Sequence, residues 1–208
     1  MTRLDGGFIN PGTLAGNRLK DSAEVLRTQL IQESAARYQI PWTAWRVWDA
    51  LQTNLPGTSA NDDLGLIGGT FGTNTPSIQT SDLKAAGATT RYARAQIELP
   101  PEYDDNATVT LRAHAGLKTT VADTSATIDF QLYEGNLEAG LGSDLIATSA
   151  TTINSLTLAD KDFVVTSTSL ASGDVLDIRM VVAVNDGATG TAVIAVVGNV
   201  ELLLDIRG

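Results

Sequence analysis

The chain of 208 residues has no cysteine, a single histidine and few aromatic residues (5%). The absence of cysteine excludes disulfides, thiolate catalysis and cysteine-ligated metal sites. The one histidine, His114, lies in Arg-Ala-His-Ala-Gly, which shows neither a Ser-His-Asp pattern nor a nucleophile elbow. We therefore expect no catalytic residue, and we expect His114 to make hydrogen bonds at a surface or an interface.

Long apolar runs and positive charge are also lacking. No run approaches the roughly 18–20 apolar residues that cross a bilayer, and the longest, Ala192–Ile206, is interrupted by polar residues and glycine. The first residues lack the apolar segment of a signal peptide. With a net charge of −10, the chain should be repelled by nucleic-acid phosphates. We expect a soluble protein made in the cytoplasm of a cell, with no membrane partner and no nucleic-acid partner.

The charge divides the chain near residue 48. Residues 1–48 carry a net charge of +2 and residues 49–208 carry −12. The first part is rich in helix formers from Leu14 to Tyr38, and Ile40-Pro41 should end a helix because the residue before proline leaves the α region. We therefore predict two parts: an arm (1–48) with a tail, a helix and a Trp-rich junction, and a body (49–208).

The arm carries the residues expected to make contacts between chains. An apolar stripe with 4-3-4 spacing consists of Leu19, Ala23, Leu26 and Leu30. The stripe packs either on its own body or in a parallel bundle of copies, and we favour a homotrimer. The tail is either a frayed terminus or a docking peptide with anchors Leu4, Phe8 and Ile9. Trp42, Trp45 and Trp48 are interpreted as an apolar plug where arm meets body, with a stacking platform for sugars as the alternative.

The body alternates between strand-like segments and turns. We predict strands at Trp45–Ala50, Leu64–Gly68, Ser77–Thr80, Arg91–Leu99, Ala107–Leu117, Ala126–Glu134, Leu145–Ala150, Asp162–Thr168, Val175–Asn185 and Thr191–Ile206. Several alternate apolar and polar residues, which indicates one buried and one exposed face. The predicted fold class is mainly β: an antiparallel jelly-roll β-sandwich preceded by an N-terminal α-helical arm.

The acidic residues show no diagnostic ligand spacing. Asp104, Asp105 and Asn106, with Glu102 nearby, offer the oxygen ligands that calcium uses, but their spacing is not that of an EF-hand. A turn between strands explains them better. Glycoside hydrolysis needs two facing carboxylates, and no pair stands out among the acids of the body. We predict no metal and no cofactor.

The chain resembles the head decoration (cement) proteins of tailed bacteriophages and their related head-fibre modules. The resemblance rests on the helical arm, the Trp-rich junction, the cysteine-free acidic body, and the segments Leu55–Thr73 and Ser172–Arg179. It implies a non-enzymatic virion protein on the capsid surface, a homotrimer that binds the major capsid protein and stabilises the shell. The alternative is a receptor- or glycan-binding jelly-roll module of a phage fibre, with Tyr103 or Tyr133 as an exposed aromatic contact. A hydrolase acting on host polysaccharide is a third reading.

Overall fold

The computed structural model describes residues 35–135, 142–147, 149–187 and 190–207. The apolar stripe of Leu19, Ala23, Leu26 and Leu30 lies outside the described residues, as do the anchors Leu4, Phe8 and Ile9. The oligomerisation and docking roles of these residues therefore stay predictions.

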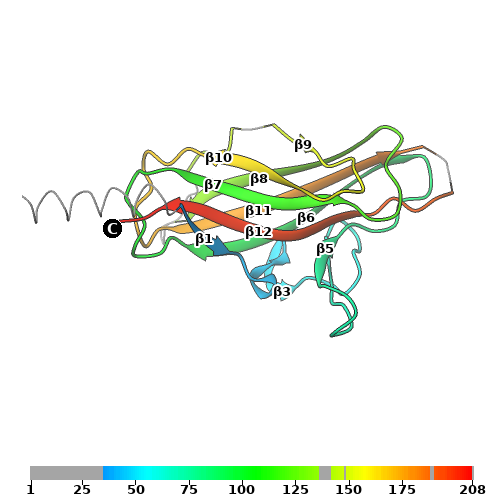
Figure 1. Ribbon diagram of the computed structural model, residues 1–208, viewed down its shortest axis with the longest axis horizontal. Coiled ribbons are helices and arrows are strands. Elements are labelled where there is room, and N and C mark those ends of the chain that lie inside the picture. Colours follow the sequence, from blue (N-terminus) through cyan, green and yellow to red (C-terminus); the bar gives the residue numbers. More distant parts are fainter. Residues whose placement is uncertain (1–34, 136–141, 148, 188–189, 208) are drawn as a thin grey trace, which may run out of the picture.

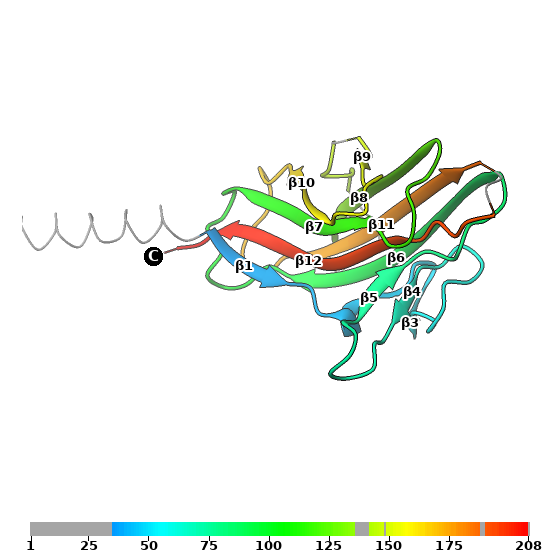
Figure 2. The same cartoon turned by 45° about the vertical axis from the view of Figure 1, so that its right-hand side comes forward.

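The described part forms two antiparallel sheets (Figures 1 and 2). Sheet A has the order β10-β7-β12-β5-β4, with β1 also paired to β12, and sheet B has the order β3-β2-β6-β11-β8-β9. The strands are β1 (Ala35–Gln39), β2 (Arg46–Val47), β3 (Ala50–Asn54), β4 (Gly65–Ile67), β5 (Ser77–Gln79), β6 (Gly87–Glu98), β7 (Val109–Leu117), β8 (Ser125–Gly135), β9 (Thr151–Thr152), β10 (Ala159–Val165), β11 (Val175–Asp186) and β12 (Ala195–Asp205). A three-residue 3-10 turn, η1 (Trp42–Ala44), follows β1.

The six long strands run along the long axis of the molecule and build the sandwich (Figure 1). From β6 to β12, the strands of five or more residues lie alternately in sheet B and sheet A, so that consecutive connections cross between the sheets as in a jelly roll. The predicted mainly β, two-sheet sandwich is confirmed. Figures 1 and 2 show β3 and β5, with β4 between them in Figure 2, gathered at one side of the long strands.

The alternation of apolar and polar residues is the reason these segments form half-buried strands. In β8 the buried residues alternate with half-buried polar ones, and β7 and β11 follow the same pattern over most of their length. The buried side chains of the two sheets meet in one core, where Phe130 of β8 and Phe163 of β10 pack edge to face with ring centroids 5.0 Å apart. Each sheet thereby buries one face and leaves the other free.

The predicted helix is wrong at its end, since Ala35–Gln39 forms strand β1. β1 pairs antiparallel with the last part of β12, with Arg37 opposite Leu203. The edge of β12 beyond its pairing with β5 would otherwise leave backbone groups unpaired, and β1 satisfies them. Tertiary hydrogen bonding thus overrides helix propensity here. The boundary between arm and body at residue 48 stays a prediction.

Other predicted strands and turns show mixed outcomes. Trp45–Ala50 is split into β2 and β3 by a turn at Trp48-Asp49, and the described residues of 145–150 form no strand. The latter segment is instead held by its own hydrogen bonds: Leu145 donates its N–H to the Leu132 carbonyl, and the Asp144 carboxylate accepts the N–H of Ile146. Gly198 marks a bulge in β12, because the register with β7 shifts there.

Replacing Phe163 with alanine should lower the free energy of unfolding by about 3–5 kcal/mol, because the substitution leaves a cavity beside Phe130. Val164, its neighbour in β10, is 63% exposed on the opposite face, so Val164→Ala should change stability by less than about 0.5 kcal/mol. Urea unfolding of both variants measures the difference. Equal losses would contradict the assigned register of β10.

Candidate functional site

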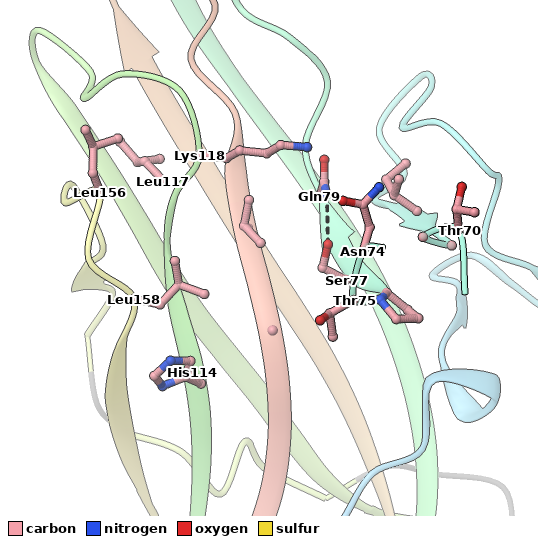
Figure 3. A pocket seen from close by; sticks show the side chains of 16 residues that line it. Thr70, Asn74, Thr75, Ser77, Gln79, His114, Leu117, Lys118, Leu156 and Leu158 are labelled. Atoms are coloured by element: carbon pink, nitrogen blue, oxygen red, sulfur yellow. Dashed lines mark hydrogen bonds between the residues drawn. The ribbon is translucent and has the colours of Figure 1, made fainter. Parts of the chain in front are cut away.

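The first candidate site is a cleft on the outer face of sheet A (Figure 3). We use the name cleft for this hollow of about 730 Å³. Its floor includes β12 and β5, and its sides are the loop after β4, the end of β7 and the loop before β10. The lining residues are Ile67, Gly68, Gly69, Thr70, Asn74, Thr75, Pro76, Ser77, Gln79, His114, Leu117, Lys118, Leu156, Leu158, Val196 and Gly198.

The walls of the cleft are held by close backbone packing. A Cβ added at Gly69 would lie 2.3 Å from the carbonyl oxygen of Asn74, so only glycine fits where this loop closes. The N–H groups of Thr73 and Asn74 both donate to the Thr70 carbonyl, at 2.9 and 3.0 Å. On the other side, Leu158 packs directly over Gly116 of β7. The cleft is therefore a preformed feature of the fold.

The polar groups of the cleft are fixed by neighbours. Gln79 donates an amide N–H to the Ser77 hydroxyl at 2.8 Å. His114, a half-exposed residue of β7, has Nδ1 2.7 Å from an oxygen of Asp160 on β10, which agrees with the predicted hydrogen-bonding histidine at a surface. Figure 3 shows Lys118 extending across the cleft toward the side that carries Asn74 and Gln79.

The second candidate site lies on the outer face of sheet B. We call it the platform, a set of side chains around a hollow of about 300 Å³. They are Trp48, Asp49, Arg94, Gln131, Tyr133, Asp177 and Arg179. They come from the β2–β3 turn and from the outward positions of β6, β8 and β11.

An ion pair between neighbouring strands anchors the platform. Arg94 and Asp177 form a bidentate pair, with Nε of Arg94 donating to Oδ1 at 2.7 Å and Nη2 donating to Oδ2. The hydrogen bonds that Arg94 donates to Asp177 raise the pKa of Arg94. Asp177 is only 5% exposed, and the amide of Gln96 adds a further donor at 3.3 Å. Paired in this way, the carboxylate tolerates burial.

Arg179 joins the polar and aromatic parts of the platform. Its guanidinium donates to the side-chain oxygen of Gln131 and lies 5.4 Å from the ring centroids of both Trp48 and Tyr92. Guanidinium groups at this distance from aromatic faces make favourable cation–π contacts. Arg179 is therefore held in one orientation by three neighbours.

Two adjacent acids fix Trp48. Its indole Nε1 donates to Asp62 at 3.0 Å, its backbone N–H donates to the Asp63 carboxylate, and its ring lies 5.1 Å from that of Tyr92. Burial raises the pKa of Asp63, and the nearby charges of Asp62 and Asp49 raise it further. The position of Trp48 therefore depends on a carboxylate whose ionised form is disfavoured by burial and by neighbouring negative charges.

The other residues singled out from the sequence lie elsewhere. Trp45 is buried in the core, while Trp42 lies half-buried in η1 beside a separate shallow hollow, and the plug stays a prediction. The prediction that Tyr103 is exposed is wrong. Its ring is buried, and its hydroxyl donates to the Ala107 carbonyl at 2.7 Å. Tyr133 does reach the surface, in the platform.

The acidic turn is occupied by protein partners. Arg207 pairs with Asp104 at 3.5 Å and also with Asp105, which accepts the N–H of Ser172 at 2.9 Å. This hydrogen bond lowers the pKa of Asp105. Within the described ranges, no group of three or more His, Asp or Glu side chains is arranged to hold a metal ion. The same part of the chain has no helix long and apolar enough to cross a membrane.

Sequence reasoning named two residues of the platform, Trp48 and Tyr133, but not the polar side chains between them. The available signal was the alternation in Ala126–Glu134 and Val175–Asn185, which places Gln131, Asp177 and Arg179 on outward faces. What was missing was the pairing of β11 with both β6 and β8. The cleft had no sequence signal beyond the Gly-, Thr- and Asn-rich stretch Gly68–Thr75.

Replacing Asp63 with asparagine should raise the melting temperature at pH 7. The pKa of this carboxyl is raised in the folded protein above its ordinary 3.8, so its ionised form destabilises the native state. As the pH falls through the folded pKa, protonation removes this penalty, and the advantage of Asp63→Asn should shrink toward zero by about pH 4. Thermal melts at both pH values measure this. Asp82→Asn, at the surface beside Lys84, is the control, and a lower melting temperature for Asp63→Asn at pH 7 would contradict the assignment.

Comparison with known proteins gives weak likenesses. No protein-family model and no curated protein matches the chain. The CBM22-1 xylan-binding domain of Paenibacillus barcinonensis Xyn10C is 11% identical, with a TM-score of 0.42, over 84% of this chain and 96% of that domain. The xylan-binding module CBM15 is 12% identical, with a TM-score of 0.42, over 83% of this chain and 99% of that module. Fisc, a Stig cyclase from Fischerella sp. TAU, is 14% identical, with a TM-score of 0.42, over 82% of this chain and 90% of the cyclase. Likeness at this level carries no conclusion about function, and a non-enzymatic role stays a prediction.

Proposed function

We propose that the chain is a glycan-binding β-sandwich module that holds a sugar on the platform of sheet B. The observation that carries the proposal is the arrangement of Trp48 and Tyr133 around a hollow that also presents Arg94, Gln131 and Asp177. This is the chemical composition that sugar recognition requires. A pyranose ring has apolar C–H faces that pack on aromatic rings, and its edge carries hydroxyls that need hydrogen-bonding partners.

The polar side chains of the platform suit hydroxyl pairs. These groups are planar: a guanidinium presents two donors side by side, a carboxylate presents two acceptors, and an amide presents one donor beside one acceptor. Arg94 and Arg179 provide donors, Asp177 provides acceptors, and Gln131 provides both. Ligand sites in proteins combine apolar surface with a few such fixed polar groups.

The internal bonds of the platform hold these groups before a ligand arrives. The bonds of Arg94 to Asp177 and of Arg179 to Gln131 fix four side chains on three adjacent strands. A fixed site avoids much of the entropy cost of ordering long side chains on binding, which is about 0.5–1.5 kcal/mol per side chain. The hollow lies at the lower end of the usual volume range of about 300–1,000 Å³, so we expect a short stretch of sugar to be bound.

The virion setting stays part of the proposal. If the chain is a virion protein, as its resemblance to phage proteins implies, the platform would make it the receptor- or glycan-binding module of a fibre. The capsid-cement homotrimer with the major capsid protein as partner stays a prediction, since its contact residues were placed in the arm. No contact among the described residues favours it.

Replacing Trp48 with alanine should weaken sugar binding by about tenfold to a hundredfold, since a stacked aromatic ring contributes on the order of 1–3 kcal/mol. Tyr133→Ala should also weaken it, and Tyr133→Phe should retain most of the affinity if the ring matters more than the hydroxyl. The probes are neutral β-1,4-linked hexasaccharides of xylose, glucose, galactose and N-acetylglucosamine, tested on an array and by calorimetry.

Phe71→Ala is the matched control, because Phe71 is a fully exposed aromatic residue outside the platform. It should leave the affinity for these sugars unchanged. Circular dichroism and melting temperature exclude loss of the fold in each variant. The proposal fails if no hexasaccharide binds the full chain, or if Phe71→Ala and Trp48→Ala weaken binding equally.

A further inference from the structure

We infer that the cleft on sheet A is a second binding site, separate from the platform, and that its ligand is an acidic saccharide whose carboxylate lies against Lys118. The two sites are on the outer faces of opposite sheets. Binding in the cleft does not depend on the proposed function of the platform.

Charge is the first argument. The chain has 24 acidic and 14 basic side chains, yet none of the residues that line the cleft is acidic. The cleft instead contains Lys118 and the imidazole of His114. Within the described part of the chain, no carboxylate forms an ion pair with Lys118. A hollow whose charged lining group is the ammonium of Lys118, with no carboxylate in the lining, attracts anions.

The orientation of His114 is the second argument. Its Nδ1 lies 2.7 Å from an oxygen of Asp160, which is not one of the lining residues. When Nδ1 is held by a carboxylate, the other ring nitrogen is left for a second partner. Asp160 therefore acts as a positioning residue for His114.

The remaining lining groups select a sugar. Asn74, Gln79 and the hydroxyls of Thr70, Thr75 and Ser77 offer donors and acceptors, and Leu156 and Leu158 offer apolar surface. Gly68 leaves the backbone open to a ligand, since a Cβ there would meet no atom within 4 Å. Phosphate sites typically use arginine pairs or helix N-termini, and the lining has neither. One ammonium with many neutral polar groups suits a singly charged carboxylate on a hydroxyl-rich molecule.

The test uses tetragalacturonate, its fully methyl-esterified form and inorganic phosphate as three probes of the full chain, measured by calorimetry at low salt. We expect tetragalacturonate to bind and phosphate not to bind. Lys118→Gln should weaken tetragalacturonate binding by about tenfold, since a charge-assisted hydrogen bond is lost, and should not change the affinity for the ester. Raising the salt concentration should weaken binding of the acid form only.

Lys84→Gln is the matched control: it removes the same charge from an exposed lysine outside the cleft, and affinity should not change. Trp48→Ala should also retain tetragalacturonate binding, which separates this site from the platform. Amide signals of Gly68 and Gly198 should shift on titration. The inference is overturned if tetragalacturonate does not bind, if phosphate binds equally well, if Lys118→Gln and Lys84→Gln behave alike, or if only Trp48→Ala abolishes binding.

Discussion

The structure depends on the complete pairing of β11. All of its residues pair with β6, from Val175 opposite Glu98 to Asp186 opposite Gly87, and nearly all pair with β8 on the other side. A strand paired on both edges cannot slip by one residue without turning its apolar set out of the core. The buried row from Leu176 to Val184 therefore fixes the register of sheet B, and through the core it fixes the distance to sheet A.

The same register determines which side chains lie on the outer face of sheet B. Because Asp177 and Arg179 alternate with the core residues of β11, they lie on the outer face beside Arg94 of β6 and Gln131 of β8. Trp48 reaches this face from a turn that two acids hold in place. The platform is thus a product of strand pairing, and the two residues of its ion pair, Arg94 and Asp177, are 83 residues apart in the chain.

The sequence predicted the sandwich because alternation is a local signal. Burial in β7, β8 and β11 follows the pattern read from their residues, and the bulge at Gly198 follows from a glycine within a strand. The strand β1 was not predictable in the same way, because helix formers surround it and only the free edge of β12 makes it extended. The prediction for Tyr103 failed for a related reason, because its burial depends on packing partners that the local sequence pattern does not show. The segment Leu55–Thr73, which carried the resemblance to phage proteins, supplies both Asp62 beside Trp48 and one wall of the cleft.

The ion pair of Arg94 and Asp177 bears on whether the platform is structural or functional. A half-buried or buried ion pair contributes little net stability, because desolvating both charges offsets their attraction, and apolar side chains of similar volume often stabilise as well or better. The outward positions of β11 after Arg179 show that this sheet accepts such residues, since Val181 and Ala183 occupy them. Stability alone therefore gives no reason for two arginines, an aspartate and a glutamine to adjoin one another beside Trp48. A site that must meet hydroxyl groups with fixed, planar partners does give such a reason.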